Sequence, residues 1–101
     1  MLSNAPANGL ELLSLMAAKA AERASAQLYG SIRLAKCEGL ELAEGFIADE
    51  VDLESWAVRA DEQYAVIAVF ATASQEDGGR RMAASGRFTF AALPRQRVRR
   101  A

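Results

Sequence analysis

Asn8 and Glu11 are the first two side chains in the sequence whose types and spacing could do chemistry. Asn followed three residues later by Glu is the capping-box arrangement, in which each side chain accepts a hydrogen bond from the other residue's free backbone N–H. A carboxylate at such a place could also act as a base, but caps are far commoner than catalytic acids. The spacing therefore predicts a helix that begins next to Asn8, and capping explains both residues without a ligand.

The residue types exclude several kinds of catalytic site. The 101 residues include one cysteine, Cys37, and no histidine, so the usual Cys/His zinc sites, histidine-based triads and an internal disulfide are excluded. Ser14 has no histidine to activate it, and we interpret it as a hydroxyl on a helix face. The acids of residues 38–62 lack the Asp-x-Asp-x-Asp-Gly pattern of a calcium loop and are interpreted as a solvated edge. No metal site is predicted.

Charge and hydropathy restrict the partners. The formal net charge of -1 gives no overall field that would attract nucleic acid or an anionic membrane. The arginines of residues 95–100 form a short basic tail without interleaved aromatic residues. No apolar run approaches the ~18 residues of a membrane span, and the N-terminus lacks the features of a signal peptide. We therefore expect a cytoplasmic protein with neither nucleic acid nor membrane as a partner.

One long helix followed by strands is predicted to position these residues. Residues from Leu10 to about Gln27 are good helix formers, with no glycine or proline after Gly9. Apolar side chains cover nearly the whole circumference, which predicts a helix buried on most sides. After Gly30 the apolar period changes from 3.6 to 2, and strand-like runs follow over residues 31–37, 40–47, 51–60, 64–74 and 81–93.

The last two runs have the clearest patterns. Residues 64–74 are apolar on both faces, as in a central strand, and turns are predicted at residues 61–63 and 76–79. The final run alternates, with one face predicted to hold Met82, Ala84, Phe88, Phe90 and Ala92 and the other Arg81, Ser85, Arg87 and Thr89. A helix followed by an antiparallel meander predicts one α+β domain over residues 9–93, between an irregular lead-in (1–8) and a basic tail (94–101).

Three stretches of the chain carry a family likeness. Asn4-Ala5, Asn8-Gly9 and Glu11-Leu-Leu-Ser-Leu-Met16 resemble Ala-Asn…Gly-Gly-x-Leu-Leu-Ser-x-Met-Asp. Gly45-Phe-Ile-Ala-Asp-Glu-Val51 resembles Pro-x-x-x-Gly-Asp-x-Val. Gly86-Arg-Phe-Thr-Phe-Ala-Ala-Leu93 resembles the strand Phe-Thr-Phe-Val-Ala-Leu. These patterns belong to the acyl-CoA thioesterases (acyl-CoA thioester hydrolases) of the hotdog fold, and the resemblance covers about residues 4–93.

The resemblance implies the hotdog fold, in which a curved antiparallel sheet wraps one long central helix. Because the sequence starts at the helix entry, the N-terminal strand of that fold is expected to be short or missing. In the family the residue after the helix methionine is commonly the catalytic Asp. Here it is Ala17, which can neither activate a water nor attack a thioester.

The resemblance also implies a set of site residues. In hotdog enzymes the thioester carbonyl lies at the N-terminus of the central helix, where free N–H groups and the helix dipole polarise it. This would make Asn8, Gly9 and Leu10 substrate-binding residues and Glu11 a substitute catalytic base, although capping is favoured for Glu11. Arg80 and Arg81 could hold the phosphates of coenzyme A, with a solvated strand edge as the equal alternative. Coenzyme A enters only as part of the substrate, and no separate cofactor is expected.

The expected function follows from the family. The chain resembles an acyl-CoA thioesterase that hydrolyses or binds acyl-CoA thioesters at a groove between subunits. Pairing of sheet edges would form a homodimer, and two dimers could form a homotetramer. The alternative is a non-catalytic hotdog domain that binds an acyl thioester or a protein partner, since the usual acid is Ala17.

Overall fold

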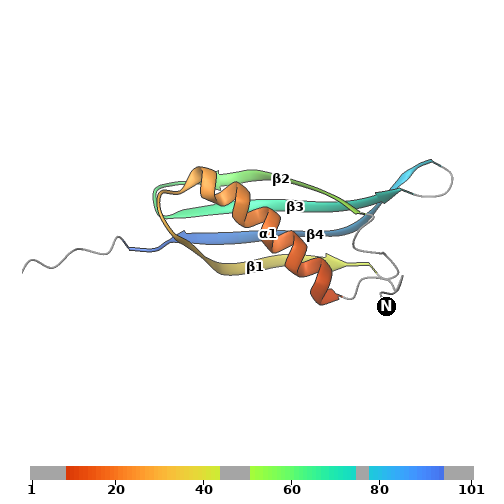
Figure 1. Ribbon diagram of the computed structural model, residues 1–101, viewed down its shortest axis with the longest axis horizontal. Coiled ribbons are helices and arrows are strands. Elements are labelled where there is room, and N and C mark those ends of the chain that lie inside the picture. Colours follow the sequence, from red (N-terminus) through yellow and green to blue (C-terminus); the bar gives the residue numbers. More distant parts are fainter. Residues whose placement is uncertain (1–8, 44–50, 75–77, 95–101) are drawn as a thin grey trace, which may run out of the picture.

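A computed structural model describes residues 9–43, 51–74 and 78–94, which form one helix and one sheet (Figure 1). Helix α1 spans Gly9–Gln27, and the strands are β1 (Ile32–Leu42), β2 (Val51–Ala60), β3 (Tyr64–Ser74) and β4 (Arg80–Ala92). All neighbouring strands are antiparallel, in the order β1-β4-β3-β2. Helix α1 crosses one face of the sheet diagonally, from β1 at its N-terminal end to β2 (Figure 1). The predicted α+β plan is confirmed; residues 1–8 and 95–101 lie outside the described residues.

Helix α1 packs on the sheet through one stripe of side chains. Its buried residues follow one another at steps of four, which places them on a single face: Leu12, Met16, Ala20 and Ala24. On the other side, Leu10 is 76% exposed and Leu15 is 39% exposed. The expectation of a helix buried on most sides is therefore wrong for the single chain, because the sheet covers only one side of it.

Strand β3 lies inside the sheet between β4 and β2, as predicted. Every second side chain of β3 is fully buried beneath α1: Ala65, Ile67, Val69 and Ala71. The alternate side chains point to the face of the sheet away from α1, called the far face below. There Trp56 of β2 stacks on Phe70 of β3, with ring centroids 4.9 Å apart, while Trp56 remains 47% exposed.

Strand β4 contains one residue more than its partner requires. Ala84 pairs with Ala71 and Met82 pairs with Thr72, so Ala83 is an extra, bulged residue. An inserted residue reverses the alternation of faces for the part of the strand that precedes it. Met82 therefore shares the far face with Thr72, rather than the face of Phe88 and Phe90. This corrects the predicted faces at the start of β4, where Met82 and Arg81 exchange sides.

Strand β1 joins two runs that the sequence predicted separately. Gly39 has a φ of +61°, a conformation that glycine adopts without steric cost, and the pairing with β4 shifts register between Glu38 and Glu41. A glycine at this bulge lets the strand continue instead of ending it. Residues 44–47 of the second predicted run lie outside the described residues.

The predicted turn at residues 61–63 is stabilised by its own first side chain. Asp61 Oδ1 accepts hydrogen bonds from the backbone N–H groups of Gln63 (2.8 Å) and Tyr64 (2.9 Å). This local arrangement is typical of aspartate in turns, and it sets the point at which β3 begins.

Candidate active site

The N-terminus of α1 lies at the end of the sheet where β1 ends and β4 begins (Figure 1). A Cβ added at Gly9 would lie 3.2 Å from Leu42 Cδ1, so glycine allows the end of β1 to approach the helix start closely. The first N–H groups of a helix have no partner within the helix, and the helix dipole is positive there. This helix start is therefore suited to stabilise negative charge on the oxygen of a reacting carbonyl.

Two other predicted site residues occupy the first turn of α1. Leu10 is largely exposed, and Glu11 is the exposed acidic residue of that turn. A carboxylate is stabilised by the dipole at this position, so the placement of Glu11 suits both capping and a chemical role. Asn8, the predicted cap, lies outside the described residues. Ala17 lies two turns further along, partly buried against the core, and its methyl group can accept no proton.

An open hollow of about 300 Å³ lies at the same end of the sheet. It is formed where the end of β1 meets the bulge of β4, and its lining is Glu41, Leu42, Ala43, Met82, Ala83, Ala84 and Ser85. Of its lining residues, Glu41, Met82 and Ser85 belong to the far face. Leu42 connects the hollow to the helix, because the same side chain lies against Gly9. Five of the hollow's seven lining residues are apolar.

A second hollow, of about 490 Å³, lies on the far face towards the β2–β3 turn. Its charged lining residues are Lys36, Glu38, Arg59 and Asp61. Lys36 Nζ lies 3.3 Å from Glu38 Oε2, and the four charges cancel formally. This balance offers no net charge to an anionic ligand, so the hollow at Leu42 is the better candidate site.

The bulge at Ala83 places the two predicted arginines on opposite faces. Arg81 pairs with Ala73, which belongs to the face that α1 covers. Arg80 pairs with Ser74 and points to the far face. Of the two, only Arg81 shares its face and its end of the sheet with the helix N-terminus.

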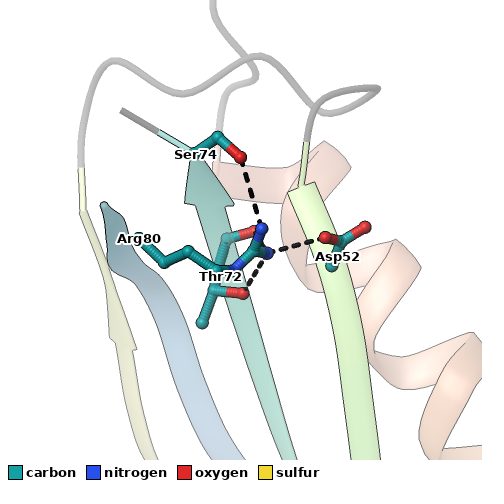
Figure 2. A network of polar contacts seen from close by, with 4 residues as sticks. All are labelled: Asp52, Thr72, Ser74 and Arg80. Carbon is teal, nitrogen blue, oxygen red and sulfur yellow. Dashed lines mark hydrogen bonds and ion pairs between the residues drawn. The ribbon is translucent and has the colours of Figure 1, made fainter. Parts of the chain in front are cut away.

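Arg80 lies in a network of polar contacts that joins three strands (Figure 2). Its Nη2 donates to Asp52 Oδ2 of β2 (2.6 Å) and to Thr72 Oγ1 of β3 (2.6 Å). Its Nη1 donates to Ser74 Oγ at 3.3 Å. The guanidinium thus has carboxylate and hydroxyl partners from this chain on the far face.

Some residues of the hollow were missed by the sequence analysis. Leu42 and Ala83 were assigned to strands and to no site. The signal for Ala83 was its place beside Ala84, since two neighbouring small apolar residues interrupt the alternation of β4. A bulge next to a site is common, because it changes the direction of the side chains around it.

The described groups with a shifted pKa lie away from the helix start. Hydrogen bonds from the backbone N–H groups of Gln63 and Tyr64 lower the pKa of Asp61. Burial raises the pKa of the Cys37 thiol, and the neighbouring Glu38 carboxylate adds to this. Among residues 9–43, 51–74 and 78–94, no group of three or more His, Cys, Asp and Glu side chains could hold a metal ion. Within these ranges, no helix has both the length and the apolar character needed to cross a membrane.

Comparisons with known proteins find likeness in structure alone. No protein-family model matches the chain, and no curated protein matches it. A hexameric broad-specificity acyl-coenzyme A thioesterase matches with a TM-score of 0.78 and 17% identity, over 93% of this chain and 67% of its own. A hexameric thioesterase from Yersinia pestis matches with a TM-score of 0.77 and 19% identity, over 93% of this chain and 79% of its own.

A third solved structure carries the name of the fold. The hexameric hotdog-fold thioesterase of Campylobacter jejuni matches with a TM-score of 0.69 and 17% identity, over 89% of this chain and 71% of its own. Likeness at these identities establishes shape rather than chemistry. With one long helix laid across antiparallel strands in the order β1-β4-β3-β2, this chain has the hotdog fold.

Proposed function

We propose that this chain is an acyl-CoA thioesterase-like protein that binds acyl-CoA thioesters at a groove between two copies. The observation that carries the proposal is the meeting of three features at one end of the sheet: the helix start at Gly9, the hollow at Leu42 and the side chain of Arg81. The helix start suits the thioester carbonyl, the hollow suits the adjoining chain, and an arginine suits the phosphates. The structural neighbours named as thioesterases support the same substrate class.

Hydrolysis at this site requires a base as well as the helix start. Water attacks the thioester carbonyl carbon, the C–S bond breaks, and the products are a carboxylic acid and the thiol of coenzyme A. The N–H groups of Gly9 and Leu10 would stabilise the oxyanion of the intermediate. The Glu11 carboxylate stands beside them in the first turn and could accept the proton of the attacking water.

Ala17 favours a second function, which is binding without hydrolysis. Its methyl group replaces the acid that the family resemblance leads one to expect, and the neighbouring positions on α1 offer no histidine. A groove that retains the helix start but lacks a general base would hold an acyl thioester, or a protein partner that carries one, without cleaving it.

The geometry of the sheet supports a homodimer formed through β2. The strands β1 and β2 are the two edge strands of the sheet, and the pairing of β1 with β4 shifts register twice. By contrast β2 pairs without a break from Val51 to Ala57. A regular terminal strand is the better template for a strand of a second copy, because bulges and twists discourage such pairing.

The enzymatic proposal is tested by measuring the hydrolysis of a panel of acyl-CoA substrates. The readout is the free thiol of coenzyme A that the reaction releases. If Glu11 is the base, Glu11→Gln should lower kcat by about 100-fold or more without changing KM greatly. Glu22→Gln is the matched control, since Glu22 is an exposed glutamate on the same helix, far from its N-terminus. Equal activity in Glu11→Gln and the unaltered protein would exclude Glu11 as the base.

The non-catalytic alternative predicts the opposite result. The unaltered protein should bind coenzyme A and its thioesters without hydrolysing them, and Ala17→Asp should create hydrolysis. The control is Ala18→Asp, which adds the same acid one exposed position further along. No saturable binding of coenzyme A to the unaltered protein would reject both forms of the proposal and leave only protein binding.

A further inference from the structure

The bulge in β4 decides which of two consecutive arginines reaches the candidate site. If β4 continued from Ala84 without a bulge, Ala83 would pair with Thr72. The alternation of the strand would then place Arg80 on the face of α1 and Arg81 on the far face. The bulge exchanges them. The orientation of Arg81 therefore depends on β4 keeping this register at its first residues, where the ladder of backbone hydrogen bonds is interrupted.

The contacts of Arg80 hold the strand in that register. Asp52 and Thr72 pair directly across β2 and β3, and Arg80 of β4 donates from Nη2 to the Asp52 carboxylate and the Thr72 hydroxyl (Figure 2). The backbone carbonyl oxygen of Thr72 is a third, longer acceptor, at 3.4 Å. The nitrogen has only two hydrogens, so these acceptors occupy both. A phosphate that approached Nη2 would have to displace the Asp52 carboxylate or the Thr72 hydroxyl.

The planar guanidinium is required for this arrangement. One nitrogen joins the strands β2 and β3, and the other reaches Ser74 of β3, so a single side chain from β4 contacts three residues at fixed angles. A lysine ammonium is a point charge on a flexible stem and does not fix the three strands in the same way. The Asp52–Arg80 ion pair is exposed to solvent, so its Coulomb energy adds little stability. Its effect is to fix the orientation of the Arg80 guanidinium.

We propose that Arg80 is a positioning residue, which holds the bulged start of β4 so that Arg81 faces the phosphates of coenzyme A. The inference rests on the proposed function and divides the two predicted phosphate-binding arginines into one that binds and one that positions.

Arg81 lies beside Met82, which lines the hollow, and two pairing positions from Ala84, roughly 7 Å along the strand. Ala84 pairs with Leu42, the residue that lies against Gly9 at the helix start. A pantetheine arm separates the thioester from the phosphates, so a phosphate contact at a distance from the helix start is what coenzyme A requires.

Calorimetric titration with coenzyme A, and with an acyl-pantetheine that has no phosphates, tests the division of roles. Arg81→Gln should weaken coenzyme A binding by about tenfold, the loss of a charge-assisted hydrogen bond. Arg80→Lys and Thr72→Val should each weaken it by roughly threefold. None of these changes should affect acyl-pantetheine. Thr72→Val keeps the shape of the side chain and removes only the hydroxyl acceptor, so it carries the test if Arg80→Lys folds poorly.

Asp52→Asn separates positioning from simple electrostatics. Removing this carboxylate makes the end of the sheet more positive, so an electrostatic role for Arg80 predicts tighter binding of coenzyme A. A positioning role predicts weaker binding, because Arg80 loses its carboxylate partner. Amide hydrogen exchange gives an independent readout: exchange at residues 80–83 should quicken in Arg80→Lys and Asp52→Asn, and stay unchanged in Arg87→Lys, an exposed arginine further along the same strand.

The outcomes distinguish this inference from the proposed function. Tighter binding of coenzyme A by Asp52→Asn, or undiminished binding by both Arg80→Lys and Thr72→Val, would overturn the positioning role while leaving the thioester site in place. Absence of any coenzyme A binding by the unaltered protein would overturn the proposed function, and the inference with it. Weakened binding of coenzyme A, unchanged binding of acyl-pantetheine and faster exchange at residues 80–83 would establish it.

Discussion

The guanidinium of Arg23 donates a 2.7 Å hydrogen bond to the backbone carbonyl of Ser55, and this contact ties the second half of helix α1 to strand β2. Ser55 is a buried polar residue, 8% exposed, beneath the helix. The Arg23 Nε also lies 3.5 Å from the Ser55 hydroxyl oxygen. Since β2 ends the sheet, the contact fixes the helix against the strand that we propose as the dimer edge.

Removing this contact should loosen the helix from β2. We expect Arg23→Ala to lower the free energy of unfolding by about 1 kcal/mol, because a charged donor to a half-buried carbonyl is lost. The measurement is urea unfolding at a fixed protein concentration. Arg33→Ala, at an exposed arginine of β1, is the control and should change stability by less than about 0.5 kcal/mol. Equal effects of the two changes would mean that the Arg23 contact adds nothing.

Met16 and Leu15 are neighbours on α1 with opposite surroundings. Met16 is fully buried in the core, whereas Leu15 is 39% exposed. Met16→Ala should cost about 2–5 kcal/mol, the usual range for truncating a long core side chain. Leu15→Ala should cost clearly less in the same urea experiment. A loss at Leu15 as large as that at Met16 would show that a second copy covers the outer side of the helix in solution.

The elements with a clean pattern were predictable from the sequence. The bounds of β2 and β3 agree with the predicted runs 51–60 and 64–74, because the residues between them have the turn chemistry that Asp61 then provides. The helix was predictable from its residue types and from the position of Asn8. The fraction of the helix surface that is buried in the single chain was not predictable. Apolar residues around a helix do not show whether the same chain or a partner buries them.

The faces of β4 show what a pattern of alternation misses. The only mark of the extra residue in the sequence is the pair of neighbouring small residues Ala83 and Ala84, which are both buried. Such a pair is a weak signal, because the pattern of the strand as a whole still alternates. The helix start at Gly9 and Leu10 could be predicted, since capping has a sequence signature. Its interpretation as a candidate site came from the family resemblance. The placement of Arg80 and Arg81 on opposite faces of the sheet could not be predicted. It depends on the register between strands, which the alternation within β4 does not reveal.

Cys37 should react slowly with alkylating reagents, although it is exposed. Burial raises the pKa of its thiol, and the negative charge of Glu38 raises the pKa further, so less of the reactive thiolate is present at mildly basic pH. We expect iodoacetamide to label the folded chain a few-fold more slowly than the same chain unfolded in urea. Glu38→Gln should restore only part of the rate, since burial is the larger cause. Equal rates for the folded and unfolded chains would contradict this account.

Asp61 should make the stability of the β2–β3 turn depend on pH. The backbone N–H groups of Gln63 and Tyr64 bind its carboxylate and hold the pKa of the folded chain below the ordinary 3.8. A carboxyl group whose pKa falls on folding stabilises the folded state above its ordinary pKa, and this contribution disappears as the pH falls through the lower folded value. Asp61→Asn retains an acceptor oxygen but has no charge to titrate.

The comparison of Asp61→Asn with the unaltered protein gives the test. Thermal unfolding should show the unaltered chain to be the more stable at neutral pH, and the difference should shrink as the pH is lowered below about 3.8. Glu62→Gln, at the next position, is exposed and should show no comparable change with pH, which makes it the control. A difference between Asp61→Asn and the unaltered protein that stays constant down to low pH would mean that the ionised carboxylate is no better an acceptor here than a neutral amide oxygen.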